Sequence, residues 1–319
     1  MSIISNNISK AIEILNQDDL VAIPTETVYG LAGNIYSESA IRKIFALKQR
    51  PLFNPLIVHI KSIEQLPELA REIPEKARRL AEAFWPGPLT FVLKKQPRVP
   101  DLVTAGKDSV AIRIPNHPVA LALLEALHFP LAAPSANPFG CISPTSAAHV
   151  AAYFPDSLKM VLEGGDCKNG IESTIVGFEN GTPVLYRLGS ISVEDIEVVI
   201  GAIEVKNKKE VAPDAPGMLS RHYAPRTPTF LTDDVAAFIQ AYPAKKIGLL
   251  LFKSRIEHPA VHAQEILSEA GSLAEATANL YAAMHRLDKL GLDMIVAERF
   301  PDHDLGMSIN DRLERATKK

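Results

Sequence analysis

Residues 20–31 read LVAIPTETVYGL: a short apolar run that ends at Pro24 and is followed at once by Thr25, Glu26 and Thr27. The apolar run predicts a short buried strand, and the polar residues then lie in the loop at its end. Open α/β sheets bind ligands in the crevice above such strand ends. The stretch therefore predicts an α/β sheet with hydroxyl and carboxylate groups over a crevice, or simply a turn closed by a threonine hydrogen bond.

Strand and helix patterns alternate on both sides of this stretch. Apolar residues at helical spacing precede it over residues 8–15, and Ser37 is placed as the N-cap of the helix that follows it. Further helical patterns lie at 74–85, 117–127, 143–154 and 192–200. Strand-like runs lie at 55–60, 88–95, 109–114, 130–135, 159–165, 172–178 and 183–188. About nine strands with fewer helices predict a mixed, twisted α/β (α+β-like) sheet with flanking helices.

The pattern changes between residues 202 and 230, where prolines are frequent and no apolar period is present. A connection this long is either disordered or functional. Met218, Leu219, His222 and Tyr223 interrupt it, and a purely solvating linker would not need them. A smaller α/β pattern follows, with strands at 245–252 and 293–300 and helices at 272–290 and 308–317. We therefore expect a first domain over 1–201, a linker over 202–230 and a small C-terminal α/β domain over 231–319.

Composition excludes several classes of protein. The chain has 319 residues, and its 34 basic against 37 acidic side chains give a net charge of −3, so no global positive field favours nucleic acid. No apolar stretch approaches the roughly 20 residues that cross a bilayer, and the N-terminus lacks the pattern of a signal peptide. We expect a cytoplasmic protein without a membrane segment and with reduced thiols at Cys141 and Cys167. Dinucleotide, P-loop, zinc-hydrolase and nucleophile-elbow motifs are absent from the sequence.

Two groups of basic residues suit an anionic ligand. Lys48 and Arg50 lie two apart before Pro51, and such a pair of cations suits a triphosphate, although a solvated helix C-terminus is the simpler alternative. Arg113 lies within the apolar run SVAIRI, so it must have a partner or face a cavity. It could clamp a carboxylate or form a buried ion pair.

Small and polar residues form a third group, APSAN over 133–137, followed by Ser143-Pro144-Thr145. Small side chains let a ligand approach the backbone, while serine and asparagine supply hydrogen bonds. Ser143 before Pro144 also has the pattern of a helix N-cap, with proline in the first turn.

Taken together, these motifs resemble the threonylcarbamoyl-AMP synthase family, the proteins built on a YrdC-type domain. The resemblance is carried in order by PTETVYGL, KQRPLFNPLIVHI, WPGPLTFVL, VAIRIPNHP, APSANPFGCISPT, GIESTIV and YRLGS, and then by PGMLSRHYAP and LGMSINDRLERA. It covers essentially the whole chain and points to the longer, two-domain form of the family.

The resemblance implies a reaction: L-threonine, bicarbonate or CO2 and ATP give threonylcarbamoyl-AMP and pyrophosphate. Through downstream threonylcarbamoyl-transfer proteins, the product then modifies the adenosine next to the anticodon of tRNA. Mg²⁺ is expected to arrive with ATP, with no metal held by the protein alone. The linker over 202–230 then becomes a lid that excludes water from a hydrolysable anhydride.

The resemblance also implies roles for individual residues. Lys48 and Arg50 would be the catalytic cations beside the phosphates. The ATP-binding residues would be Arg50, Asn54, Ser109, Ser135, Asn137, Ser143, Arg187 and Tyr223. The threonine-binding residues would be Thr27, His59, Arg113, Ala133 (through its backbone) and Ser173.

Two alternatives remain open at this point. The first is a module that binds tRNA or double-stranded RNA through Lys48, Arg50, Arg113 and Arg187, which the nearly neutral net charge disfavours. Weak RNA binding by the enzyme itself is compatible with the same residues. The second is an enzyme of the same fold that adenylates another carbamate. A pocket without partners for the threonine hydroxyl would distinguish poorly between threonine and other acceptors.

Overall fold

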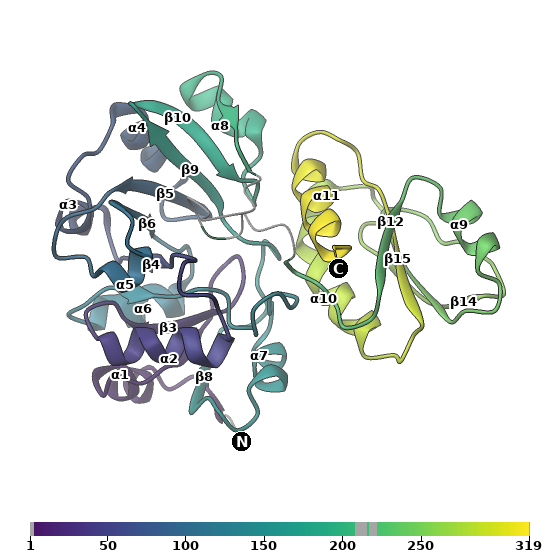
Figure 1. Cartoon of the computed structure of the whole chain (residues 1–319), viewed down its shortest axis with the longest axis horizontal. Coiled ribbons are helices and arrows are strands. Elements are labelled where there is room, and N and C mark those ends of the chain that lie inside the picture. The colour runs from purple at the N-terminus through teal and green to yellow at the C-terminus, as the bar shows by residue number, and fades with distance from the viewer. Residues whose placement is uncertain (1–2, 208–215, 217–221, 319) are drawn as a thin grey trace.

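The computed structural model describes residues 3–207, 216 and 222–318. Two sheets organise these residues: a mixed sheet of eleven strands and a parallel sheet of four. Figure 1 shows them as two bodies side by side, with helices α10 (Leu273–Asp288) and α11 (Leu305–Ala316) on the side of the smaller body that faces the larger one. The expected mixed α/β fold with two domains is confirmed.

The large sheet has the strand order β1-β8-β2-β3-β7-β4-β6-β5-β9-β10-β11. Its strands are β1 (Ile3–Ser5), β2 (Val21–Ile23), β3 (Gly30–Asn34), β4 (Ile57–His59), β5 (Leu89–Lys94), β6 (Ser109–Arg113), β7 (Leu131–Ala132), β8 (Met160–Leu162), β9 (Thr174–Glu179), β10 (Thr182–Arg187) and β11 (Glu204–Val205). Strands β4 and β6 are parallel, so His59 and Arg113 pair at the same end of the sheet. This end carries part of the site.

Helices cover both faces of the large sheet. The helices are α1 (Ile8–Asn16), α2 (Glu38–Lys48), α3 (Leu66–Leu69), α4 (Glu75–Phe84), α5 (Asp101–Thr104), α6 (Pro118–Ala126), α7 (Ala147–Tyr153) and α8 (Val193–Ile200), with a 3-10 turn at Ile63–Gln65. Leu31 of β3 belongs to a core cluster that also contains residues of α2, α4 and α8, whereas the adjacent Ala32 belongs to a cluster that contains residues of α1 and α6. Successive side chains of a strand point to opposite faces, so one strand serves both cores.

The N-caps show one confirmed expectation and one error. The Ser37 side chain accepts a hydrogen bond from Ala40 N and caps α2, as predicted. Helix α7 is instead capped by Ser146, whose side chain accepts from His149 N, so the N-cap interpretation of Ser143 is wrong. Ser143 lies three residues before this cap, and its hydroxyl donates a hydrogen bond to the carboxylate of Glu172.

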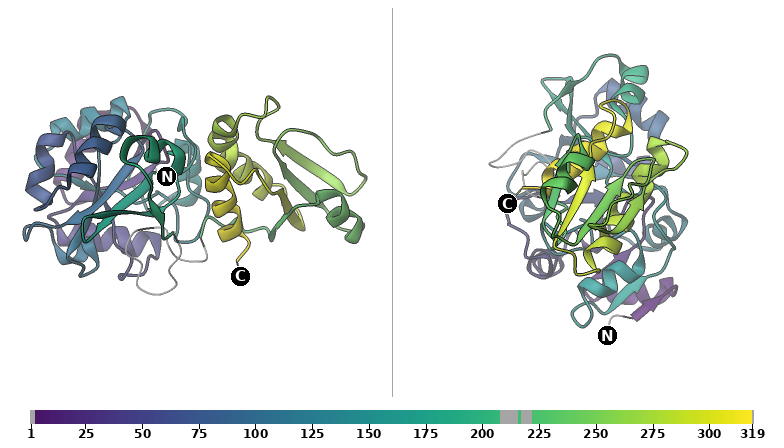
Figure 2. Two further views of the ribbon diagram at one scale, coloured as in Figure 1. Left: turned by 90° about the horizontal axis from the view of Figure 1, so that it is seen from above. Right: turned by 90° about the vertical axis from the view of Figure 1, so that its right-hand side faces the viewer.

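The small sheet has the order β12-β15-β13-β14, formed by β12 (Thr229–Thr232), β13 (Ile247–Leu251), β14 (Val261–Ile266) and β15 (Met294–Glu298). Helix α9 (Val235–Ala241) packs on one face with Leu249. Helices α10 and α11 pack on the other face with Leu250, in a cluster that also contains Val28, Ile142 and Tyr223 from the larger body and the connecting segment. Figure 2 (left) shows the yellow C-terminal helix between the small sheet and the large body.

Several elements escaped the sequence patterns. Strand β3 has the sequence GLAGN without a β-branched residue, and β14 is a half-exposed edge strand with the mixed sequence VHAQEI. Strands β1, β11 and β12 and helix α9 were also not expected, and β11 and the first residues of β12 fall within 202–230. Met218 and Leu219 lie outside the described residues. Within those residues, no helix combines the length and apolar character needed to cross a bilayer.

Phe91 should contribute strongly to stability, because its side chain in β5 has no solvent exposure and packs against Trp85. We expect Phe91→Ala to lower the free energy of unfolding by about 3–5 kcal/mol, measured by urea denaturation. Phe53→Ala is the control, because Phe53 is 52% exposed and its loss should change stability by less than about 0.5 kcal/mol. Equal denaturation midpoints for the two variants would contradict this view of the core.

Candidate active site

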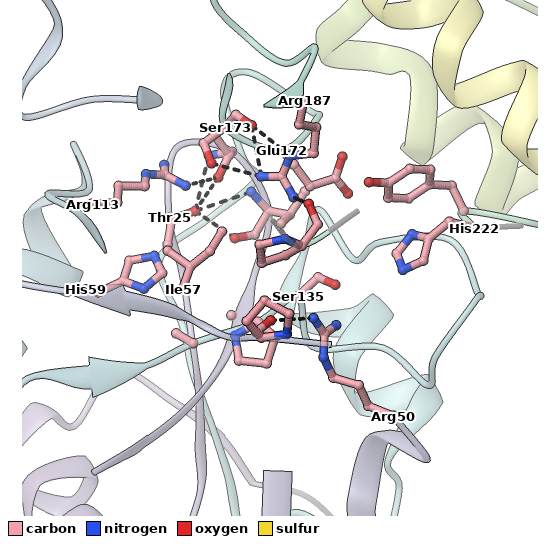
Figure 3. Close-up of a pocket in the computed structure, with 18 residues that line it drawn as sticks. Thr25, Arg50, Ile57, His59, Arg113, Ser135, Glu172, Ser173, Arg187 and His222 are labelled. Atoms are coloured by element: carbon pink, nitrogen blue, oxygen red, sulfur yellow. Dashed lines mark hydrogen bonds between the residues drawn. The ribbon is translucent and has the colours of Figure 1, made fainter. Parts of the chain in front are cut away.

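One pocket gathers loops from strand ends that are far apart in the sequence. Its cavity volume is about 50 Å³. Figure 3 shows Arg113 and His59 at one end and Arg50 and His222 at the other. The lining residues are Thr25, Thr27, Val28, Gly30, Arg50, Pro55, Ile57, His59, Arg113, Ala133, Pro134, Ser135, Glu172, Ser173, Arg187, Pro216, His222 and Tyr223.

Arg113 is the last residue of β6 and is 3% exposed. Its Nη1 donates to Thr27 Oγ1 at 2.9 Å and its Nε donates to the Gly87 carbonyl oxygen at 3.1 Å. Its Nη2 lies 2.6 Å from Glu26 Oε1, so the buried ion pair that the sequence allowed is present. The guanidinium also lines the pocket. Because it carries five N–H donors, it can hold Thr27, Gly87 and Glu26 and still bind a carboxylate from the pocket side.

His59 and Ala133 complete this end of the pocket. Burial, and then the charge of Arg113, lower the pKa of His59 to about 3, so its ring is neutral at pH 7. Within the described part of the chain its Nδ1 has no hydrogen-bond partner, which makes it available to a ligand. Ala133 donates its N–H to the Ile57 carbonyl oxygen at 3.0 Å, so a ligand contact through its backbone would use the carbonyl.

Ser173 and Arg187 connect the two ends of the pocket. Arg187 Nη2 donates to Ser173 Oγ at 2.9 Å and to the Ser173 carbonyl oxygen at 2.8 Å, and Nη1 donates to the Pro216 carbonyl oxygen at 3.3 Å. The Ser173 hydroxyl also lies 2.7 Å from Thr90 Oγ1. All five residues expected to bind threonine therefore line one continuous wall.

Arg50 marks the opposite end and is 8% exposed. Its Nη2 donates to Asn54 Oδ1 and to the Pro55 carbonyl oxygen, both at 2.7 Å. Burial lowers the pKa of Arg50 to about 9, with Tyr223 opposing and Arg187 adding to the shift. Asn54 itself does not line the pocket, but its loop holds the guanidinium toward it.

Lys48 does not line the pocket either. Its ammonium donates to the Ser135 carbonyl oxygen at 2.5 Å and to the Asn137 carbonyl oxygen at 2.6 Å, so it ties the end of α2 to the APSAN loop. Asn137 turns its amide to the Pro138 and Cys141 carbonyl oxygens, each at 2.9 Å. Burial, and then the charge of Arg50, hold the pKa of Lys48 well below its ordinary value. Of the four residues Lys48, Arg50, Ser135 and Asn137, which were all expected at the phosphates, Arg50 and Ser135 line the pocket.

Ser109 and Ser143 lie behind the wall. Ser109 begins β6 two residues before Ala111, which pairs with Ile57, so Ser109 is at the same end of the sheet as Pro55 and the Arg50 loop. Ser143 is fully buried and donates its hydroxyl to Glu172 Oε1 at 2.6 Å. Neither of the two serines lines the pocket.

The sequence placed the carboxylate of Glu26 over a crevice, but it gave no partner for Glu26 and no role in the site to Glu172 or His222. Glu26 and Glu172 lie within quoted motifs, PTET and GIEST, but their partners are distant in the sequence: Glu26 pairs with Arg113, and Glu172 Oε2 accepts from Arg312 Nε at 3.1 Å. His222 lines the pocket beside Tyr223. The motifs that contain the two glutamates were visible in the sequence. Nothing in the sequence indicated which residues they pair with.

The pocket has the charge of an anion site. Among the described residues, three guanidinium groups line it, from Arg50, Arg113 and Arg187, against the one carboxylate of Glu172. Within the described residues no three His, Cys, Asp or Glu side chains converge on one point, so these residues do not form a metal site of their own.

A stacked pair of histidines contacts Ser143, the residue that donates its hydroxyl to Glu172. The rings of His149 and His285 are 3.9 Å apart, and His285 Nε2 lies 3.2 Å from the Ser143 carbonyl oxygen. Burial, and then the charge of its partner, lower the pKa of His149 to about 3, and burial lowers that of His285 to about 4.

These shifts predict a loss of stability in acid. The unfolded chain, with a histidine pKa of 6.5, takes up protons that the folded pair does not, so the free energy of unfolding should fall as the pH drops from 6.5 toward about 4. His285→Gln should make this decline shallower in urea denaturation at pH 7, 6 and 5, whereas replacement of the exposed His262 should not. Equal slopes for both variants would exclude the pair as a source of acid sensitivity.

Comparisons with known proteins agree with the two-body architecture. A family model described as "Telomere recombination" matches residues 13–189, and one described as "Threonylcarbamoyl-AMP synthase, C-terminal domain" matches residues 191–317. The threonylcarbamoyl-AMP synthase of Pyrococcus abyssi is 41% identical over 95% of this chain and 92% of its own length. That of Bacillus subtilis is 40% identical over 97% of this chain and 92% of its own length.

A solved structure extends the similarity to three dimensions. The crystal structure of P. abyssi Sua5 complexed with L-threonine superimposes with a TM-score of 0.92 at 40% sequence identity. The match covers 99% of this chain and 98% of that one.

Proposed function

The chain belongs to the threonylcarbamoyl-AMP synthase family, and we propose that the pocket described above carries out this reaction with L-threonine, bicarbonate-derived CO2 and ATP. The amine of threonine adds to CO2 to give a carbamate and releases a proton. A carbamate oxygen then attacks the α-phosphorus of ATP, and the bond to the leaving pyrophosphate breaks. The products are threonylcarbamoyl-AMP and pyrophosphate. Such a transfer needs positioning and charge neutralisation more than a protein nucleophile.

We propose that threonine binds at the Arg113 end. The observation that carries this assignment is the orientation of the Arg113 guanidinium, which Thr27, Gly87 and Glu26 fix in the lining of the pocket. Fixed donors of this kind suit a bidentate carboxylate. The neutral His59 and the hydroxyl of Ser173 lie on the same wall and supply polar groups for the amine and hydroxyl of threonine.

The nucleotide is proposed to extend from this point toward Arg50. Arg187 in the middle of the pocket and Arg50 at its end place positive charge where a triphosphate would run. An arriving phosphate would also favour the charged form of Lys48, whose burial disfavours it. Because the described residues form no metal cluster, we propose that Mg²⁺ enters as part of the MgATP substrate.

Pro216, His222 and Tyr223 are proposed to act as part of a lid. All three line the pocket, as residues of a segment that covers the bound substrates would. Tyr223 is 1% exposed. A lid that closes over the site would protect the mixed anhydride from water.

The product should then pass to proteins that transfer its threonylcarbamoyl group to tRNA, and we place this step in the cytoplasm. The nearly neutral net charge argues against RNA binding as the main role of the chain. Contact with tRNA or double-stranded RNA would therefore be weak and secondary.

Pyrophosphate release is the direct test of the proposed reaction. We expect the purified protein to release pyrophosphate from MgATP in a manner that requires both L-threonine and bicarbonate, with L-serine a poorer substrate because it lacks the methyl group. Release that is independent of threonine would favour another acceptor. Tight RNA binding without release would favour the binding-module alternative.

Arg50 and Lys48 should be required for different reasons. Arg50→Ala removes a cation from the pocket wall and should lower kcat/KM by about 100-fold or more, as expected for a charge that stabilises phosphoryl transfer. Lys48→Ala should cause a loss of similar size, because the Ser135 and Asn137 carbonyl oxygens lose their shared donor. Circular dichroism should show both variants folded. Near-normal turnover in either folded variant would contradict its role.

A further inference from the structure

Arg312 of α11 is a charged side chain with no solvent exposure at the contact between the two bodies. Its Nη2 donates to the Leu188 carbonyl oxygen at 2.6 Å, its Nη1 donates to Asp311 Oδ2 at 2.8 Å, and its Nε donates to Glu172 Oε2 at 3.1 Å. Arg312 does not line the pocket, but Glu172 does. A helix of the small domain therefore reaches the pocket wall through one buried ion pair.

Glu172 also contacts Ser143, one of the residues expected to bind ATP. Its Oε2 also accepts a hydrogen bond from the Tyr281 hydroxyl of α10 at 2.9 Å, while its Oε1 accepts from Ser143 at 2.6 Å. Burial alone would raise the pKa of Glu172, but the charges of Arg312 and Arg187 hold it below its ordinary value. The carboxylate therefore stays ionised and keeps Ser143 in a fixed position.

Tyr223 is held by the same two residues of the small domain. The Arg312 guanidinium carbon lies 5.0 Å from the centre of the Tyr223 ring, and the Tyr281 ring stacks on it at 5.8 Å. The backbone of Tyr223 has a φ of 62°, which a residue with a side chain adopts only when its surroundings hold it there. Among the described residues its buried hydroxyl finds no hydrogen-bond partner, so it is available to a ligand in the pocket it lines.

The two bodies approach each other closely at this place. A Cβ built on Gly170, two residues before Glu172, would come within 2.3 Å of the Ala278 carbonyl oxygen of α10. Ser308 of α11 donates to the Gly189 carbonyl oxygen at 2.8 Å. These backbone contacts on either side set the distance at which Arg312 and Tyr281 meet Glu172.

We propose that Arg312 and Tyr281 of the small domain are positioning residues for the nucleotide: they fix the carboxylate of Glu172 and the ring of Tyr223, and through them the end of the pocket that binds ATP. This inference rests on the proposed function. The threonine end has a separate support, because Arg113 is held by Glu26, Thr27 and Gly87, all within the large domain. The small domain should therefore affect ATP and threonine unequally.

Arg312→Lys and Tyr281→Phe test this separation. Lysine keeps the charge of Arg312 but loses its three-way contact, and phenylalanine removes a single hydroxyl group. We expect each folded variant to raise the KM for ATP, by about tenfold for Arg312→Lys, while the KM for threonine stays within about twofold of the unaltered protein. Glu26→Gln should show the opposite pattern. Tyr242→Phe, at a 42% exposed tyrosine of the same domain, is the matched control and should change neither.

Calorimetric titration with MgATP in the absence of threonine separates the inference from the proposed reaction. If the unaltered protein binds MgATP in this titration but releases no pyrophosphate once L-threonine and bicarbonate are added, the proposed reaction fails, while weaker MgATP binding by both variants still supports the positioning role. A KM for ATP or an ATP affinity within twofold of the unaltered protein in folded Tyr281→Phe and Arg312→Lys would overturn it. An equal rise in both KM values, or no MgATP binding by the unaltered protein, would also overturn it. If Arg312→Lys does not fold, the KM for ATP and the MgATP affinity of Tyr281→Phe alone test the proposal.

Discussion

Charged side chains that leave water must find partners, and the cations of this protein do so around one pocket. Lys48, Arg50, Arg113, Arg187 and Arg312 are each less than a tenth exposed. An unpartnered buried charge costs far more than its contacts return, so each position requires acceptors already in place. The loops at the strand ends supply them, mostly as backbone carbonyl oxygens. The requirement explains why loops so distant in the sequence converge there.

The kind of partner decides what the pocket can bind. Carbonyl oxygens satisfy the N–H groups of Lys48, Arg50 and Arg187 without cancelling their charge, whereas Glu26 and Glu172 compensate Arg113 and Arg312. The wall therefore keeps an excess of positive charge in a site with little water. In such surroundings a polyanion gains more than it would at an exposed basic surface. The positive charge of the pocket therefore depends on the backbone as much as on the arginines.

The sequence predicted the features that depend on residues close to one another in the chain. Runs of β-branched residues predicted β4, β5, β6 and β9, and the motifs located all five residues on the Arg113 wall. Strand β3 was missed because its glycines and alanine carry no strand preference and are fixed by burial between two cores. The pair of Glu172 with Arg312 spans 140 positions. The spacing of apolar residues cannot predict a contact of that kind, because it forms only when the two domains pack against each other.

The proposed lid over the pocket also has a consequence for how affinity is measured. If the lid covers the pocket in the resting protein, molecules in that state do not bind a nucleotide. The measured dissociation constant is then the intrinsic one divided by the fraction of open molecules. The observed association rate is scaled down by the same fraction when opening and closing are fast. A resting equilibrium between open and closed molecules would then set the ATP concentration to which the enzyme responds, without any change in the residues that touch the nucleotide.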